Sequence, residues 1–89
     1  MLSNENRARR RDELNAYVRK VKAASPCMDC NINYPYYVMD FDHCRGIKVG
    51  DISMMVHEVV PLTRLQEEIA LCDIVCANCH RERTFSRST

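Results

Sequence analysis

The stretch CDIVCANCH, residues 72–80, predicts a fold held together by a metal ion. Two of its cysteines, Cys76 and Cys79, are separated by two residues, and the stretch CMDC at residues 27–30 contains an equivalent pair. Two thiolates with this spacing can bind one cation from a tight turn, and two such pairs complete a tetrahedral shell of four sulfur ligands. We therefore expect one structural zinc ion, bound by Cys27, Cys30, Cys76 and Cys79.

The length of the chain makes such a site important for stability. At 89 residues we expect one domain, and a domain of this size buries too little surface to be comfortably stable on its core alone. A structural zinc site can contribute about 10–16 kcal/mol of apparent binding free energy to folding. Two alternatives stay open. One is a redox C-x-x-C site, which is disfavoured because no thioredoxin-like βαβ pattern surrounds the cysteines; the other is two unrelated structural pairs.

The N-terminus and the apolar segments indicate the compartment. The first residues, MLSNENRARRR, are charged and lack the apolar region of a secretory signal. No stretch approaches the roughly 18 apolar residues of a membrane span. We therefore expect no membrane association and a reducing, cytoplasmic environment, in which paired cysteines bind metal more often than they form disulfides.

Charge is unevenly distributed, although the formal net charge is only +1. Residues 1–24 carry seven Arg and Lys against three acids, and the stretch after His80 carries three against one, whereas the middle carries three against eight. Basic ends around an acidic centre fit phosphate contacts by the ends and metal binding by the central acids. A solvated helix face plus a basic tail explains the same pattern, and charge alone does not separate the two.

Periodicity and turn residues predict an α+β arrangement. Apolar residues recur at helical spacing over residues 4–24, and Ser25-Pro26 ends that helix. The aromatic and β-branched stretch YYVMDFD predicts a strand over residues 36–42. The further elements that we expect are a short helix at 52–59, a helix at 61–71, a strand at 72–76 and a helix at 77–87.

An Asp-His pair lies between the two cysteine pairs, in the stretch DFDH that ends at His43. An aspartate can bind a hard divalent cation, and the adjacent histidine can accept a proton from water near neutral pH. If residues 73–75 pair with the first strand, Asp42, His43 and His80 converge. Neighbouring residues of a regular strand point to opposite faces, so Asp42 and His43 can cooperate only if the strand ends or bulges there.

These motifs resemble those of small HNH endonucleases of the type common in bacteria and their phages. The resemblance rests on CMDC, then DFDH with a following RGIK, and then EEIALCDIVCANCHRERT, and it covers about residues 27–84. It implies a ββα-metal fold, in which two strands and a helix surround one catalytic divalent cation, with a separate structural zinc site formed by the four paired cysteines. We therefore expect an α+β, zinc-stapled HNH domain over residues 26–89, preceded by an added basic amphipathic helix over residues 1–25.

The resemblance also implies roles for individual residues. Asp42 and His80 resemble the family's metal ligands, and His43 resembles its general base. Many members place the middle Asn several residues before the second cysteine pair, where this chain has LCD, so Asn78 is the only candidate for it. A hydrogen bond at the helix start or in the cysteine loop is the alternative role of Asn78. The implied catalytic metal is Mg²⁺ or Mn²⁺, with Ni²⁺ or Co²⁺ as alternatives.

The implied reaction is hydrolysis of phosphodiester bonds in DNA, with double-stranded DNA as the expected partner and 5′-phosphate products. Nicking and double-strand cleavage both stay open, as does the oligomeric state, a monomer included. The expected location is the cytoplasm of a bacterial cell, and a phage-encoded protein fits as well. The residues expected to contact nucleic acid are Arg7, Arg9, Arg10, Arg11, Arg45, Lys48, Arg81 and Arg83.

A different class of function fits part of the same pattern. A zinc-stapled nucleic-acid-binding module would have the cysteines and the basic ends but no hydrolytic activity. The joint presence of Asp42, His43 and His80 argues against it, because a binding module has no reason to keep them together. Asp40 shares a strand face with Asp42 and could orient a ligand histidine, although an exposed strand position is the more common role of such a residue.

Overall fold

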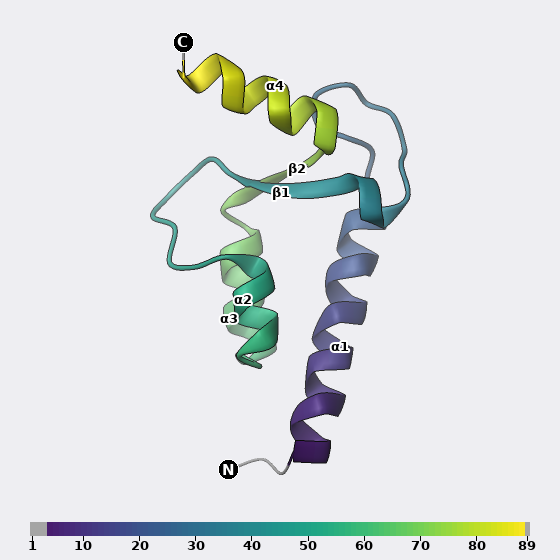
Figure 1. Cartoon of the computed structure of the whole chain (residues 1–89), viewed down its shortest axis with the longest axis vertical. Coiled ribbons are helices and arrows are strands. Elements are labelled where there is room, and N and C mark those ends of the chain that lie inside the picture. The colour runs from purple at the N-terminus through teal and green to yellow at the C-terminus, as the bar shows by residue number, and fades with distance from the viewer. Residues whose placement is uncertain (1–3, 89) are drawn as a thin grey trace.

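The computed structural model of the protein describes residues 4–88 and shows a small α+β fold (Figure 1). A two-stranded sheet lies between three helices on one side and a single helix on the other. The elements, in chain order, are α1 (Asn4–Ala23), the 3₁₀ turn η1 (Tyr36–Val38), β1 (Met39–His43), α2 (Ile52–His57), α3 (Leu62–Ile69), β2 (Cys72–Cys76) and α4 (Ala77–Ser88).

The two strands pair antiparallel over their whole length, from Met39 opposite Cys76 to His43 opposite Cys72. Residues 73–75 therefore pair with the first strand, which was the condition for Asp42, His43 and His80 to converge. This pairing brings the second cysteine pair, which begins with the last residue of β2, next to the start of β1. It also places the first turn of α4 against the sheet.

The starts of one strand and one helix differ from the sequence-based prediction. β1 begins at Met39 rather than at residue 36, because the chain first makes the 3₁₀ turn η1, in which the Val38 amide donates to the Pro35 carbonyl at 3.0 Å. α3 begins at Leu62, since Pro61 occupies the N-cap position with extended backbone angles. The helices expected at both ends of the chain are present with nearly the predicted bounds.

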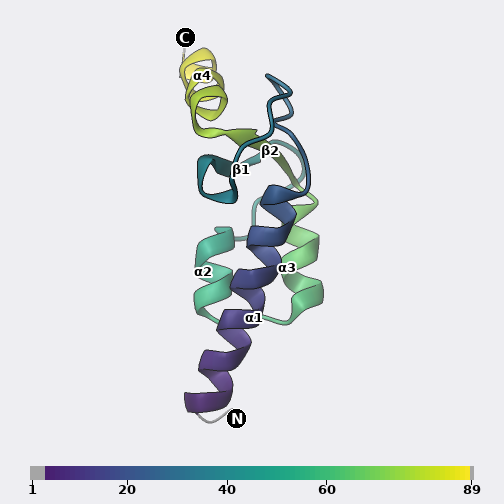
Figure 2. The ribbon, with the colours of Figure 1, turned by 90° about the vertical axis from the view of Figure 1, so that its right-hand side faces the viewer.

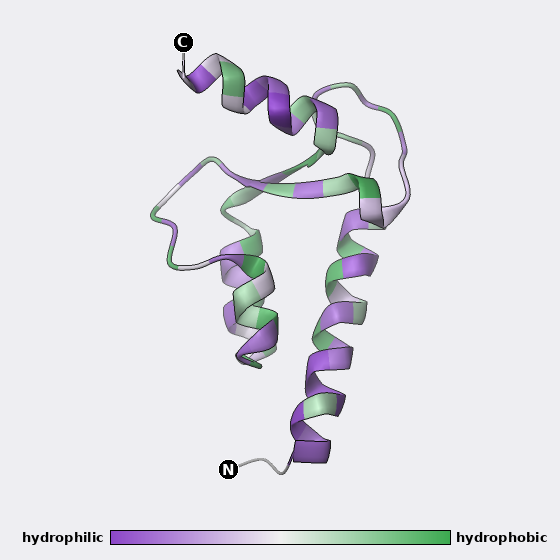
Figure 3. Cartoon of the chain, viewed as in Figure 1, coloured by the Kyte–Doolittle hydropathy of each residue, from purple (hydrophilic) through white to green (hydrophobic). Residues whose placement is uncertain are grey.

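The helical layer forms the larger of two buried clusters. In Figure 2, α1 lies across α2 and α3. Figure 3 shows that most of α1 is hydrophilic, with the apolar residues interspersed at helical spacing. The buried residues of this cluster are Leu14 of α1, Ile52, Met55 and Val56 of α2, and Leu65 of α3. The N-terminal helix therefore contributes Leu14 to the same core as the residues after 26 and packs on the domain through its apolar face.

The smaller buried cluster contains Cys27, Met39, Val75 and Cys76, at the end of the sheet where the cysteine pairs meet. Two modest clusters with few large side chains are what the length of the chain allows. Within residues 4–88 no helix combines the length and the apolar character that a membrane crossing needs.

Candidate metal centre and adjoining pocket

Four cysteines from two separate segments, the loop after α1 and the junction of β2 with α4, meet at one end of the sheet. The sulfur atoms of Cys27, Cys30, Cys76 and Cys79 all lie within 4.8 Å of one another, and those of Cys30 and Cys76 are 4.0 Å apart. A tetrahedral zinc ion with Zn–S bonds of about 2.3 Å separates its sulfur ligands by about 3.8 Å. The four cysteines can therefore hold a metal ion such as zinc, as their spacing predicts.

Backbone amides prepare Cys27 for metal binding. Burial disfavours the thiolate, but hydrogen bonds from the backbone amides of Cys30, Cys76 and Asp29 outweigh it, and the pKa of Cys27 is lowered to about 6. The Cys76 amide donates to Cys27 Sγ at 3.2 Å. A tight turn closes this loop, because Asn31 adopts a left-handed φ of 60° and its amide donates to the Cys27 carbonyl at 2.9 Å.

The partner thiols show the opposite effect. Hydrogen bonding with Cys76 and burial raise the pKa of Cys79 to about 12, because a second thiolate beside the first is unfavourable without a cation. A divalent cation removes this penalty and deprotonates its thiol ligands. The remaining two cysteines, Cys44 and Cys72, lie outside the cluster, and all six are free thiols.

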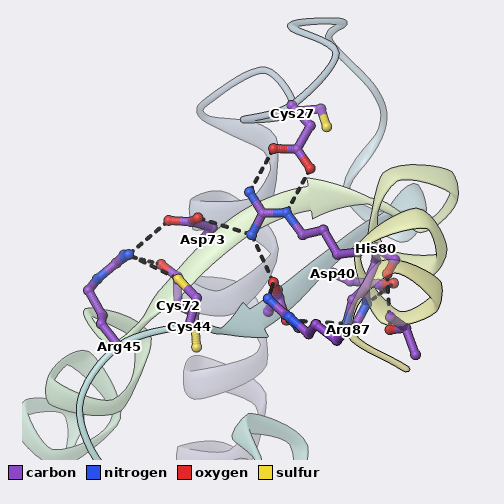
Figure 4. A network of polar contacts seen from close by, with 12 residues as sticks. Cys27, Asp40, Cys44, Arg45, Cys72, Asp73, His80 and Arg87 are labelled. Carbon is purple, nitrogen blue, oxygen red and sulfur yellow. Dashed lines mark hydrogen bonds and ion pairs between the residues drawn. The ribbon is translucent and has the colours of Figure 1, made fainter. Parts of the chain in front are cut away.

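On the face of the sheet that α4 covers, the His80 imidazole lies between two carboxylates of β1. Its Nδ1 lies 3.0 Å from Asp40 Oδ2 (Figure 4). Its Nε2 lies 3.6 Å from Asp42 Oδ1. A carboxylate can only accept, so in the neutral imidazole Nδ1 carries the proton and Nε2 has the lone pair. A carboxylate behind the imidazole is the arrangement that orients metal-binding histidines. Asp40 thus contacts His80, which is the rarer of the two roles that the sequence suggests.

Two arginines of α4 occupy both oxygens of Asp42, which is only 3% exposed. Arg87 donates to Oδ1 at 2.8 Å and to Oδ2 at 2.7 Å, and Arg83 donates to Oδ2 at 2.8 Å. The hydrogen bonds from Arg87, together with those from Arg83, outweigh burial and hold the pKa of Asp42 far below its usual range. Arg83 also binds Asp73, which lies opposite Asp42 in the sheet, and Asp29 of the first cysteine loop.

On the other face of the sheet, His43 contacts a buried glutamate of α3. Its Nε2 lies 3.0 Å from Oε2 of Glu68, whose side chain is 1% exposed. The same Glu68 oxygen accepts the Val49 amide at 3.1 Å. The second oxygen, Oε1, has no hydrogen-bond partner within the described chain, and its nearest cation is the Arg64 guanidinium at 3.6 Å. Glu68 therefore fixes both the imidazole and the loop after β1.

His43, Asp42 and His80 nevertheless border the same open pocket, which has a volume of about 780 Å³. β1 has a partner strand on one side only, so a pocket along its free edge can adjoin side chains of both faces. Asp40 and Phe41 border it as well. β1 runs without a bulge and ends at His43, so the first of the two conditions expected for cooperation of the Asp-His pair holds.

The structure does not bring Asn78 into this pocket. Asn78 lies exposed in the first turn of α4, and its side chain makes no polar contact within residues 4–88. The two histidines and Asp42 therefore meet without it.

Three of the cations expected to contact nucleic acid are paired within the fold. Arg45 donates to the Cys72 carbonyl at 2.6 Å and to Asp73 at 2.9 Å, which ties the loop after β1 to β2 (Figure 4). Lys48 forms an ion pair with Asp51 at 2.6 Å. Arg83 is held by three carboxylates, as described above.

The other expected cations are less constrained. Arg7 and Arg11 donate to carbonyl oxygens at the end of α2, and Arg9 donates to a neighbouring side chain of α1. Arg10 and Arg81 are exposed, and their side chains make no polar contact within the described part of the chain. Arg10 and Arg81 are therefore the two with all their donors available to phosphate.

Three neighbours of the site have weak signals in the sequence. Glu68 occupies the apolar side of its helix between Leu65 and Ile69, and an acid in such a stripe indicates a buried partner. Arg87 lies at the end of the chain, where a basic residue normally indicates only a solvated tail. Lys22 borders the pocket from α1. Its position there depends on how α1 packs against the sheet, which the sequence pattern does not indicate.

Comparisons of the chain with models of protein families, with curated proteins and with solved structures returned no match in any of the three. The class that the fold and the site define is therefore a small α+β chain with a four-cysteine cluster able to hold a metal ion such as zinc.

Proposed function

We propose that this chain is an HNH-type endonuclease that hydrolyses phosphodiester bonds of double-stranded DNA with a divalent metal ion. The observation that carries the proposal is the joint opening of Asp42, His43 and His80 into one pocket, although they come from different faces of the sheet and from two elements. In each histidine one nitrogen lies within hydrogen-bond distance of a carboxylate, which leaves the other nitrogen of each ring available for chemistry.

His43 acts as the general base. Its Nε2 proton is donated to Glu68, so Nδ1 accepts a proton from the attacking water. Attack by this water cleaves the bond between phosphorus and the 3′ oxygen and leaves a 5′-phosphate.

Asp42 and His80 are the residues that would hold the catalytic metal. Their facing atoms, Asp42 Oδ1 and His80 Nε2, are 3.6 Å apart, and a mixed carboxylate and imidazole pair suits Mg²⁺ or Mn²⁺. When bound, such an ion stabilises the negative charge of the phosphoryl group and of the leaving oxygen. Asp40 keeps the lone pair of His80 Nε2 directed toward Asp42.

One observation favours a second function, a zinc-stapled nucleic-acid-binding module without hydrolytic activity. Arg83 and Arg87 already satisfy the buried Asp42 carboxylate. A carboxylate so paired needs no cation for its stability, and Arg87 must release Asp42 Oδ1 before a metal ion can bind there.

A plasmid-nicking assay separates the two functions. Purified protein is incubated with supercoiled plasmid in Mg²⁺, in Mn²⁺ or without added divalent metal, beside His43→Ala and the control His57→Ala. His57 is exposed on α2 and lies outside the pocket. We expect metal-dependent cutting by the unmutated chain and by His57→Ala, and loss of about 10²–10⁴-fold in His43→Ala at unchanged zinc content.

The contrary result is equally clear. In that result, the unmutated chain cuts no plasmid, single-stranded DNA or RNA with any of these metals and still binds one of these nucleic acids with zinc in place. The nuclease proposal then fails and the binding module replaces it. End-labelling of the products tests the 5′-phosphate.

A further inference from the structure

Helix α1 forms one wall of the pocket that holds the two histidines. Four of its residues, Asn15, Val18, Arg19 and Lys22, border the pocket. Their spacing of three, four and seven residues places them on one side of the helix. This wall comes from the part of the chain that lies outside the HNH resemblance.

The two cations of this wall are held by aromatic rings. The Arg19 guanidinium lies over Tyr36 at 5.1 Å from the ring centroid, and the Lys22 ammonium lies over Phe41 at 5.2 Å. Such contacts stabilise a cation only weakly at exposed sites, and they leave its charge uncompensated. They also restrict the side chains, so less conformational entropy is lost when an anion binds.

These two cations differ from every other cationic or histidine side chain that borders the pocket. Lys48 is paired with Asp51, His43 with Glu68 and His80 with Asp40. Neither Arg19 nor Lys22 forms an ion pair with a carboxylate within residues 4–88.

The remaining charges of the pocket make this difference important. Asp40, Asp42 and Asp51 all border it, and a phosphodiester strand that approaches the two histidines must pass these carboxylates. The cations that contact Asp42 and Asp51 are Arg83, Arg87 and Lys48, and all three are already engaged by these carboxylates. Among the side chains that border the pocket, uncompensated positive charge therefore comes from Arg19 and Lys22, and it supplies the attraction that a polyanion needs there.

We propose that Arg19 and Lys22 bind backbone phosphates that flank the scissile phosphate, so that α1 is the substrate-positioning wall of the site. This inference rests on the proposed nuclease function, but it concerns binding rather than the chemical step. It assigns these contacts to the pocket end of α1, apart from the arginines at residues 7–11.

Lys22 and Lys20 provide a matched comparison. They lie two residues apart on the same helix, but Lys20 is exposed and does not border the pocket. Lys22→Gln, Arg19→Gln, Lys20→Gln and the charge-preserving Lys22→Arg are titrated against a fluorescent DNA duplex by anisotropy, at several salt concentrations and with no added divalent metal. Zinc content and helical circular dichroism are checked for each variant.

We expect Lys22→Gln and Arg19→Gln to weaken binding severalfold, and each to lower the slope of log K against log salt by about 0.9, the value for one lost phosphate contact in a duplex. We expect Lys20→Gln and Lys22→Arg to remain near the unmutated chain. In the nicking assay, the same two Gln variants should raise KM more than they lower kcat.

An equal loss in Lys22→Gln and Lys20→Gln would overturn the inference, because it would show a general charge effect. Absence of binding to duplex, single-stranded DNA and RNA alike would overturn it as well. If the unmutated chain binds but never cuts, and the pocket variants alone weaken that binding, the nuclease proposal fails while the assignment of Arg19 and Lys22 stands. If it cuts and neither binding nor KM responds to these variants, the assignment fails and the nuclease remains.

Discussion

Glu68 Oε2 lies 3.0 Å from His43 Nε2, across the space between α3 and β1. Burial alone would raise the pKa of Glu68, but the backbone amides of Val49 and Gly50 and the His43 side chain outweigh it, so the pKa is lowered. The glutamate is therefore ionised at neutral pH and can only accept a hydrogen bond. This pairing sets the tautomer of the imidazole that we assign as the general base.

We expect Glu68→Gln to lower kcat about 10- to 100-fold, the usual cost of losing a partner that orients a catalytic or metal-binding group, with little change in KM. The amide of Gln can donate as well as accept, so it no longer requires the proton on Nε2 of His43. Nitrogen-15 NMR of the neutral imidazole reads the tautomer directly and needs no activity. Glu67→Gln is the control, because Glu67 is the neighbouring acid of α3 and its side chain is 71% exposed. An unchanged tautomer in Glu68→Gln would reduce Glu68 to a structural role.

The same carboxylate predicts how stability depends on pH. A group whose pKa is lowered by folding stabilises the folded state above its ordinary pKa, about 4.3 for Glu, and this contribution is lost as pH falls through the folded-state pKa. We expect Glu68→Gln to reduce the free energy of unfolding by about 1–3 kcal/mol at pH 7. The difference from the unmutated chain should shrink below about pH 4. Urea unfolding between neutral and acidic pH, with equal zinc in all samples, measures this difference in free energy. A difference that grows toward acidic pH would contradict a lowered pKa of Glu68.

The sequence predicted the parts of this molecule that depend on local spacing. Two C-x-x-C pairs can bind one cation together, and the short segment before the second pair can only be a strand, so the cysteine cluster and the strand β2 were predicted; the pairing of β2 with β1 entered only as a condition. The contacts of Asp42 did not follow, because they depend on the angle at which α4 crosses the sheet. Arg87 reaches Asp42 from 45 residues away in sequence, and no local pattern encodes that distance.

The position of α1 was equally beyond local reasoning. Its apolar face is readable from the spacing of Leu14, Tyr17 and Val18, all of which pack in the helical core. Which charged residues then reach the pocket depends on how the helix rotates about that face. The basic cluster at residues 7–11 attracted attention by its density, whereas the structure brings Arg19 and Lys22 to the histidines.

Removal of the metal should unfold the chain. Within residues 4–88 the fold has two buried clusters, and one of them contains two of the four clustered cysteines, Cys27 and Cys76. We expect one zinc ion per chain by mass spectrometry under native conditions, and loss of cooperative thermal unfolding after chelation. Cys76→Ser should abolish stoichiometric zinc binding, whereas Cys44→Ser, which changes an exposed cysteine outside the cluster, should retain it. Full zinc retention by Cys76→Ser would exclude the four-cysteine site.

The arginine pair on Asp42 predicts a competition between guanidinium and metal. Arg87 contributes two hydrogen bonds to Asp42 and is half exposed, whereas Arg83 is also held by Asp29 and Asp73. Arg87 is therefore the group that a cation at Asp42 displaces. We expect Arg87→Gln to bind Mn²⁺ more tightly in isothermal titration without DNA, and to unfold at a lower denaturant concentration, because the buried Asp42 carboxylate loses two charged hydrogen bonds.

The matched control for that prediction is Arg81→Gln, because Arg81 lies on α4 as well but is exposed and without a polar contact in the described chain. It removes the same charge and should leave both the Mn²⁺ affinity and the stability near those of the unmutated chain. Equal gains in affinity in the two variants would indicate only a weaker repulsion of the cation. A gain confined to Arg87→Gln would mean that Asp42 is a metal ligand which Arg87 occupies until the ion arrives; no gain in either would favour the binding module, in which the pairing of Asp42 with arginine is permanent.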